Sequence, residues 1–219
     1  MIEGVALVID ADGVAVKAAT PLLVASSALA GGGVATVDAI LNVHVPKGFA
    51  CADSVSALAT FARRHDVRGP YAGLLTAAGT EKAETVTAQR GPLRALAIAT
   101  VGLSNAITAG ISPAAELRSA STINTIVVVD GNAEPAALVN ALMTVTEVKT
   151  LALIEAGVKG AGGHHATGTS TDAVVVAVTG RGAPARFGGP ISDFGWVVGQ
   201  AANAALRRGI ARWIAERAG

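Results

Sequence analysis

Cysteine, aromatic residues and excess charge are all scarce in this sequence of 219 residues. The single cysteine, Cys51, excludes an internal disulfide and favours a reducing, cytoplasmic location. The 17 Lys and Arg residues nearly balance the 16 Asp and Glu residues, so the net charge of +1 argues against a nucleic-acid partner. Aromatic residues make up 3%, and the core must therefore be packed from Ala, Val, Leu and Ile.

Long apolar runs are also lacking, although the mean hydropathy is +0.51. No stretch reaches the roughly 18 uninterrupted apolar residues that a membrane-spanning helix needs, so we expect no membrane partner. The first residues have neither the basic nor the apolar segment of a secretory signal. No charged, Pro-rich or Ser-rich linker divides the chain, which predicts a single domain over residues 1–219.

Hydrophobic patterning predicts the order of helices and strands. Runs of β-branched residues between turn residues predict strands near 5–9, 14–19, 40–45, 71–75, 84–89, 95–102, 123–129 and 173–178. Helices are predicted from Asp53 or Ser54 to about His65, and over 135–157 and 194–218. Several strands follow one another without a helix long enough for a crossover. The sequence therefore predicts an α+β fold, with a mixed or antiparallel β-sheet core and long helices packed on it.

Two polar segments lead directly into predicted buried strands. Residues 121–124 precede one strand, and residues 164–172 precede another. Because a rigid strand end can hold reactive groups beside solvent, both segments are candidates for an active site. Hydroxyl side chains flank Gly168, where the lack of a Cβ lets backbone amides approach a ligand and stabilise an oxyanion. The alternative is an ordinary Thr-rich turn in which Asp172 accepts hydrogen bonds from local amides.

Three other features carry polar groups of interest. Ser104 and Asn105 end an apolar run, either as a simple cap or as the wall of a pocket. Glu147 lies near the apolar stripe of the helix predicted over 135–157. Burial there would raise its pKa toward that of a general base, whereas exposure at the edge would leave it inert. His164 and His165 are adjacent, and neighbours on an extended chain point to opposite faces, which disfavours a shared metal ion.

The order of several short segments resembles the adenosylcobinamide amidohydrolase family. The matching segments are collinear between about residues 41 and 199 and comprise 40–46, 72–78, 101–106, 122–130, 147–149 and 166–172. The resemblance implies a corrinoid-salvage enzyme that hydrolyses the amide joining aminopropanol to the corrin ring, giving adenosylcobyric acid. It implies a cobalt corrinoid as substrate and no separate cofactor. The positions that match the family pattern are Asn42, Ser104, Asn105, Thr122, Asn124, Asp130, Glu147, Lys149, Thr167, Thr169 and Asp172.

Amide hydrolysis needs an activated nucleophile, an oxyanion stabiliser and a proton donor for the leaving amine. We expect Thr122 or Thr169 to attack or to position a water, with Asp172 or Glu147 as base. Asn105 and Asn124 are expected to donate hydrogen bonds to the carbonyl. The expected catalytic residues are Asp172, Thr122, Thr169, Glu147 and His165. The expected substrate-binding residues are Asn42, Ser104, Asn105, Asn124, Thr167 and Gly168, and no metal ligand is expected.

Two other functions stay open from the sequence. One is a corrinoid carrier without catalysis, which a departure from the family pattern favours: Ile191 stands in a stretch where that pattern has a histidine. The other is a divalent-metal-dependent amidohydrolase using Asp130, His165 and Asp172. The expected partner is the small-molecule corrinoid, and the Ala-rich helices can pack either internally or between subunits of a homo-oligomer.

Overall fold

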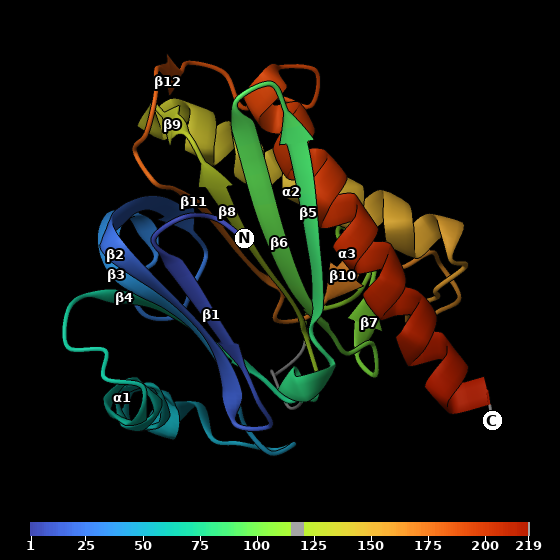
Figure 1. Cartoon of the computed structure of the whole chain (residues 1–219). Helices are drawn as coiled ribbons and strands as arrows, with labels where there is room; N and C mark the ends of the chain where they lie inside the picture. The colour runs from blue at the N-terminus through green and yellow to red at the C-terminus, as the bar shows by residue number, and fades with distance from the viewer. Residues whose placement is uncertain (115–120, 219) are drawn as a thin grey trace.

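The computed structural model describes residues 1–114 and 121–218, without the side chains of Cys51 and Ala218. Its main sheet has the strand order β4-β3-β2-β11-β8-β6-β5, and β1 pairs with β2 (Figure 1). These strands are β1 (Val5–Ile9), β2 (Gly13–Ser26), β3 (Gly33–His44), β4 (Tyr71–Thr76), β5 (Glu84–Arg90), β6 (Leu93–Val101), β8 (Ile123–Asp130) and β11 (Ala173–Val178). The helices are α1 (Ser54–Arg64), α2 (Pro135–Glu155) and α3 (Asp193–Ala218).

The sheet is mixed, as predicted, and the fold is α+β. Most neighbouring strands are antiparallel, but β3 pairs with β4 and β8 pairs with β11 in parallel. The opening strands β1, β2 and β3 pair antiparallel in chain order, as a meander, and the first parallel pairing comes with β4. Helix α1 supplies the crossover from β3 to β4, and α2 lies in the crossover from β8 to β11.

The sheet curls so that its two halves face each other. One apolar cluster contains residues of β3 and β4, such as Ile40 and Leu74, together with Ile98 of β6 and Ile126 of β8. Helices α2 and α3 cover the opposite face of β6, β8 and β11, while α1 packs through Phe61 on the outer face of β3 (Figure 1). The described chain is thus layered as helices, half-sheet, half-sheet and helix.

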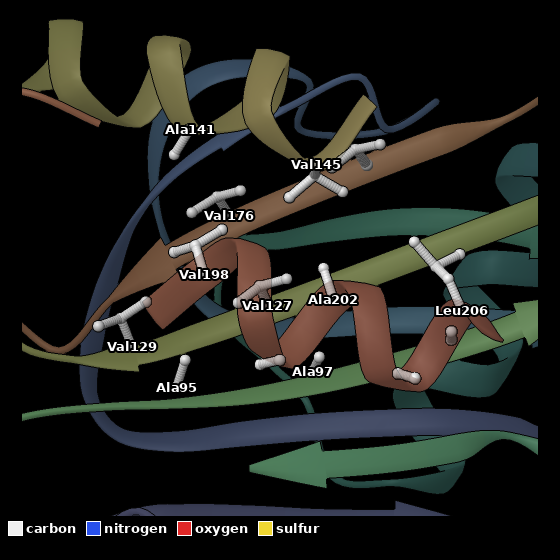
Figure 2. Close-up of a cluster of buried hydrophobic side chains, with 14 of the residues drawn as sticks. Ala95, Ala97, Val127, Val129, Ala141, Val145, Val176, Val198, Ala202 and Leu206 are labelled. Atoms are coloured by element: carbon white, nitrogen blue, oxygen red, sulfur yellow. The ribbon is translucent and has the colours of Figure 1, made fainter. Parts of the chain in front are cut away.

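The helix-covered face is packed from small residues, as the composition predicts. Figure 2 shows Ala95, Ala97, Val127 and Val129 of the sheet against Ala141, Val145, Val198, Ala202 and Leu206 of α2 and α3. Small side chains allow helices and strands to approach closely, and Phe194 is a large aromatic side chain buried among them. This close approach brings polar residues of α2 within reach of the strand ends.

Within the described residues, α2 is the helix long and apolar enough to cross a membrane by length and composition. In this fold 44% of its most apolar window is buried inside the protein. The core helix of a soluble protein passes the same test, so α2 is weak support for a membrane span.

Candidate active site

The polar segments singled out in the sequence meet at one end of the sheet. At this end β6 finishes, while β8 and β11 begin. A small antiparallel pair, β7 (Ala106–Ile107) and β10 (Gly168–Thr169), ties the segment after β6 to the segment before β11 (Figure 1). The structure therefore gathers the chain near residues 101–109, 121–124 and 165–172.

Asp172 is the centre of a buried polar cluster. Its Oδ2 accepts hydrogen bonds from Lys149 Nζ at 2.5 Å and from the Thr169 backbone N–H at 3.0 Å. Its Oδ1 accepts from the Ile123 backbone N–H at 3.0 Å and from the Thr169 hydroxyl. The side chains of Lys149 and Asp172 are each 9% exposed, so the ion pair is largely shielded from water.

These contacts define what Asp172 can do chemically. An ionised carboxylate has about four lone-pair positions, and the donors from Ile123, Lys149 and Thr169 fill them all. Asp172 can therefore take up a proton only from a group that already donates to it. The Thr169 hydroxyl is the neutral side-chain donor among these groups.

The same cluster explains why residue 168 is a glycine. A Cβ on this residue would overlap Asp172 Oδ2 and would lie 2.8 Å from Lys149 Nζ. The absence of a side chain thus makes room for the ion pair, in addition to any contact with a ligand.

A second polar cluster lies on the other face of β8, between the two half-sheets. Asn124 Nδ2 donates to Asn42 Oδ1 at 2.7 Å and to the Leu75 carbonyl at 2.9 Å. Asn42 Nδ2 in turn donates to Thr100 Oγ1 at 3.0 Å. Asn42 and Asn124 are each 1% exposed, so their amides hold the two halves of the sheet together beneath the surface.

Thr122 stands between the two clusters. Its hydroxyl donates to the Thr171 carbonyl at 2.7 Å and lies 3.3 Å from Asn124 Oδ1. A carbonyl oxygen can accept this hydrogen bond but is too weak a base to remove the proton. Among the described residues, no carboxylate accepts a hydrogen bond from the Thr122 hydroxyl, in contrast to that of Thr169.

Ser104 and Asn105 form the exposed rim of the site. Asn105 Nδ2 donates to Ser170 Oγ at 2.7 Å, and its Oδ1 is buried without a hydrogen-bond partner among the described residues. The backbone N–H of Ser104 donates to Ser121 Oγ at 3.1 Å. The Oδ1 of Asn105 is thus a buried acceptor that the described residues leave unsatisfied.

Three predicted residues lie outside the buried cluster. Glu147 is exposed on the outer side of α2, two residues before the buried Lys149. The side chain of His165 is exposed, and its carbonyl accepts from the Thr108 hydroxyl at 2.8 Å. Thr167 Oγ1 accepts from the Ala109 backbone N–H at 2.9 Å, which fastens the loop beside the site.

The metal-binding alternative is not supported by the geometry. Asp130 lies at the opposite end of β8 from Ile123, which binds Asp172, so Asp130 and Asp172 cannot share an ion. Asp130 instead accepts from Arg181 Nε at 2.6 Å, and this hydrogen bond raises the pKa of the guanidinium. Among the described residues, no group of three His, Cys, Asp or Glu side chains could hold a metal ion.

Ile191, the departure that suggested a carrier, lies in the loop before α3. Its side chain is 96% exposed. The same loop is held to α2 by the Thr144 hydroxyl, which donates to the Gly188 carbonyl at 3.1 Å. No contact between Ile191 and the Asp172 cluster is present among the described residues.

A small cavity opens beside the rim. It has a volume of about 220 Å³, and its walls include Ala78, Gly102, Ser104 and Ser121. Glu216 of α3 also lines it, and the pKa of this carboxyl is held below its ordinary value, first by the hydrogen bond from Lys82. A cavity of this size holds one arm of a ligand, since sites that enclose a drug-sized molecule span about 300–1,000 Å³.

The Thr169 hydroxyl donates to the Asp172 carboxylate, which also accepts from the Lys149 ammonium, and hydrolases that use a side-chain nucleophile place a nucleophile, a base and an orienting group in this order. The fold and site define an α+β protein with a hydrolase-type centre. Residues 3–218 match the family model described as adenosylcobinamide amidohydrolase, and the chain belongs to that family.

Similar proteins include a curated adenosylcobinamide amidohydrolase from Methanosarcina mazei, 34% identical over 147 residues. The aligned part is 67% of this chain and 64% of that protein, less than two thirds of the relative's length. A β-aminopeptidase from Burkholderia sp. is 12% identical with a TM-score of 0.49, covering 94% of this chain and 79% of that one. An L-aminopeptidase D-Ala-esterase/amidase from Ochrobactrum anthropi is also 12% identical, with a TM-score of 0.44 and coverages of 97% and 83%. Both structural likenesses are weak.

Proposed function

We propose that this chain hydrolyses adenosylcobinamide at the amide joining aminopropanol to the corrin ring, releasing aminopropanol and adenosylcobyric acid. The observation that carries the proposal is the convergence of the family's polar segments on Asp172. The match of the family model over residues 3–218 and the name of the Methanosarcina mazei relative support the same substrate.

Thr169 is the proposed nucleophile, because its hydroxyl donates to a carboxylate that can accept its proton. Its oxygen would attack the amide carbonyl carbon while the proton passes to Asp172 Oδ1. That proton then goes to the nitrogen of aminopropanol as the carbon–nitrogen bond breaks, and water hydrolyses the resulting ester. Lys149 keeps the second carboxylate oxygen occupied and so fixes the direction of the first.

Substrate would approach from the exposed side of Asn105 and Ser170, since Thr169 itself is only 6% exposed. Asn105 Nδ2 is already engaged by Ser170, whereas its Oδ1 is unused. We therefore assign Asn105 the role of accepting a hydrogen bond from the N–H of the scissile amide. This differs from the sequence expectation that Asn105 donates to the carbonyl.

The test is incubation with adenosylcobinamide, with released aminopropanol measured by mass spectrometry. Release at a rate proportional to enzyme concentration is expected. Binding of the corrinoid without release would favour the carrier and reject the hydrolase. Because both reacting groups come from the protein in this mechanism, treatment with chelators should leave the rate unchanged.

The roles of the residues are tested by a set of variants. Asp172→Asn should lower kcat by about 10²–10⁴-fold, the usual contribution of a general base. Thr169→Val leaves the Lys149–Asp172 pair in place and should cause a similar loss, which covers the case in which the first variant folds poorly. Thr122→Val and Glu147→Gln should keep most activity. A fully active Asp172→Asn enzyme would remove Asp172 from the mechanism.

Several expectations about the setting of the protein stay predictions. They are a cytoplasmic location, the absence of nucleic-acid and membrane partners, the absence of a separate cofactor, and the packing of the Ala-rich helices either internally or between subunits of a homo-oligomer. Gel filtration with light scattering at several protein concentrations would test the last of these.

A further inference from the structure

His44, the last residue of β3, has one ring nitrogen engaged and the other available. Its Nδ1 lies 3.1 Å from the carbonyl oxygen of Ala78. Because a carbonyl only accepts hydrogen bonds, Nδ1 carries the proton, and Nε2 of the neutral ring keeps its lone pair. Among the described residues, the His44 side chain makes no second hydrogen bond and no ion pair.

This arrangement is the one that metal-binding histidines adopt. A histidine that ligates through one nitrogen usually donates its other N–H to a carboxylate or a backbone carbonyl, which fixes the tautomer and the ring orientation. In His44, Nδ1 makes this supporting hydrogen bond to the Ala78 carbonyl, and Nε2 has no partner among the described residues.

The backbone holds His44 rigidly. Its N–H donates to the Asp12 carbonyl at 2.9 Å, and it pairs with Thr76 in the parallel ladder between β3 and β4. The next N–H, of Val45, donates to the Thr76 carbonyl at 2.8 Å. A ligand on a strand end fixed in this way is placed more accurately than one on a loop.

His44 also lines one cavity and contacts a residue that lines a second. It lines a cavity of about 420 Å³ together with Val43, Phe49 and Phe61. Ala78, whose carbonyl accepts the hydrogen bond from the His44 ring, lines the cavity of about 220 Å³ beside the rim of the site. A flat ligand over the larger cavity could therefore extend a side arm into the smaller one.

We propose that Nε2 of His44 binds the cobalt of the corrinoid substrate on the face opposite the adenosyl group, an inference that rests on the proposed function. In cobalamin a nucleotide base occupies the cobalt position opposite the adenosyl group. Cobinamide lacks this base, so water or a protein nitrogen can bind the cobalt there. On binding, a cobalt–nitrogen bond forms with the imidazole lone pair, the cobalt–oxygen bond to water breaks, and the intact water leaves. His44 then anchors the macrocycle, and the scissile arm reaches Ser104 and Asn105.

The test uses cob(II)inamide, whose unpaired electron couples magnetically to an axial nitrogen. Bound to the full chain, the probe should give an electron paramagnetic resonance spectrum in which each cobalt line is split into a nitrogen triplet. Protein labelled with ¹⁵N-histidine should convert each triplet into a doublet. His44→Gln should abolish the splitting, whereas His65→Gln and His164→Gln should retain it.

Steady-state kinetics give a second readout. His44→Gln should raise KM for adenosylcobinamide about tenfold and leave kcat nearly unchanged, as for a residue that positions substrate. A bound probe without nitrogen splitting, or splitting that persists in His44→Gln, would overturn the proposal. Aminopropanol release by the unmodified protein is measured in parallel. Failure of the proposed hydrolysis then appears as no release, separately from the absence of cobalt ligation.

Discussion

Lys149 and Asp172 are charged residues in a position where an apolar pair would cost less. Each side chain is 9% exposed, and moving two charges out of water is costly even when they are paired. Replacing such a pair with well-packed apolar residues is often neutral or stabilising, whereas removing one partner costs about 3–5 kcal/mol. The pair therefore adds little to folding, and its place beside the Thr169 hydroxyl favours a role in the chemistry.

Gly168→Ala tests whether the ion pair must sit where it does. The added Cβ would overlap Asp172 Oδ2 and crowd Lys149 Nζ, so one of them must move. We expect a loss of about 1–3 kcal/mol in the free energy of unfolding, as for overpacked sites, and a larger relative loss of kcat. Chemical denaturation and the aminopropanol assay measure the two effects.

The matched control is Gly199→Ala in α3. Here the new Cβ would meet Thr144 Cγ2 at 3.4 Å, an ordinary contact, and alanine is the better helix former by about 0.5–1 kcal/mol. This variant should keep its activity and be at least as stable. Equal activity of Gly168→Ala and Gly199→Ala would show that the cluster tolerates displacement.

At the scale of the single residue, the sequence indicated part of the site. Thr169 and Asp172 are three positions apart, so their contact follows from a local turn that a hydroxyl-rich segment predicts. Lys149 lies 23 positions before Asp172, and nothing local connects them. The resemblance to the family named Lys149, but residue chemistry alone did not.

Helix α2 shows why the apolar pattern alone did not indicate a buried Lys149. Its apolar residues lie on every side, and Val139, Met143 and Leu151 are exposed although they are hydrophobic. A stripe traced through the large apolar residues of this helix would include Leu151, which the structure exposes. The buried face instead follows small residues such as Ala137 and Ala141, continues through Val145, and reaches Lys149 four positions later.

The other elements were predictable because their patterns are simple. The helices predicted to start at Asp53 or Ser54 and at Pro135 begin there in the structure, and Gly157 follows the end of α2 with a φ of +69°. Strand β2 is longer than predicted, because Gly13–Ser26 continues through an irregularity in its pairing with β3 between Lys17 and Leu22. Irregular pairing breaks the simple alternation on which strand prediction depends.

A hydrogen bond that depends on pH holds the C-terminal end of α3 in place. Lys82 of the short helix η2 (Thr80–Lys82) donates to Glu216 Oε1 at 2.9 Å, and this hydrogen bond is the main cause of the lowered pKa of Glu216. A carboxyl whose pKa is lower in the folded state stabilises the fold above its unfolded pKa. That contribution is lost as the pH falls through the folded pKa.

We therefore expect the Glu216 carboxyl to titrate with a midpoint below the ordinary value of 4.5 in a carboxyl-detected NMR experiment. Lys82→Gln should move that midpoint upward, because the donor and its charge are lost. Lys159→Gln, which removes an exposed lysine elsewhere, should leave it unchanged. An unaltered midpoint in Lys82→Gln would show that the contact is not maintained in solution.

At the scale of the whole molecule, the curl of the sheet could not be predicted. Alternation identifies strands and their buried faces, but not which strands meet across the core. Asn42 and Asn124 are 82 positions apart and face each other only because β3 and β8 belong to opposite half-sheets. Asn42 and Asn124 were both expected to bind substrate. The structure places them in the interior, where they are hydrogen-bonded to each other.

The Asn42–Asn124 contact predicts that the two half-sheets unfold together. Asn124→Ala would leave Asn42 Oδ1 and the Leu75 carbonyl without this donor in a buried place. Each unsatisfied group costs about 1–3 kcal/mol, and a chain of this length loses about 2–4 °C in Tm per kcal/mol. A single cooperative transition at a lower temperature is expected by calorimetry and by circular dichroism.

A double-mutant cycle measures the interaction free energy between Asn42 and Asn124, apart from the effect of losing each side chain alone. Asn42→Ala combined with Asn124→Ala should cost less than the sum of the single changes, with a coupling free energy of about 0.5–3 kcal/mol. Asn42→Ala combined with Asn140→Ala on the surface of α2 should be additive, because Asn140 contacts neither cluster. Additivity in the first pair, or two resolved transitions in Asn124→Ala, would mean that the half-sheets are not coupled through these amides.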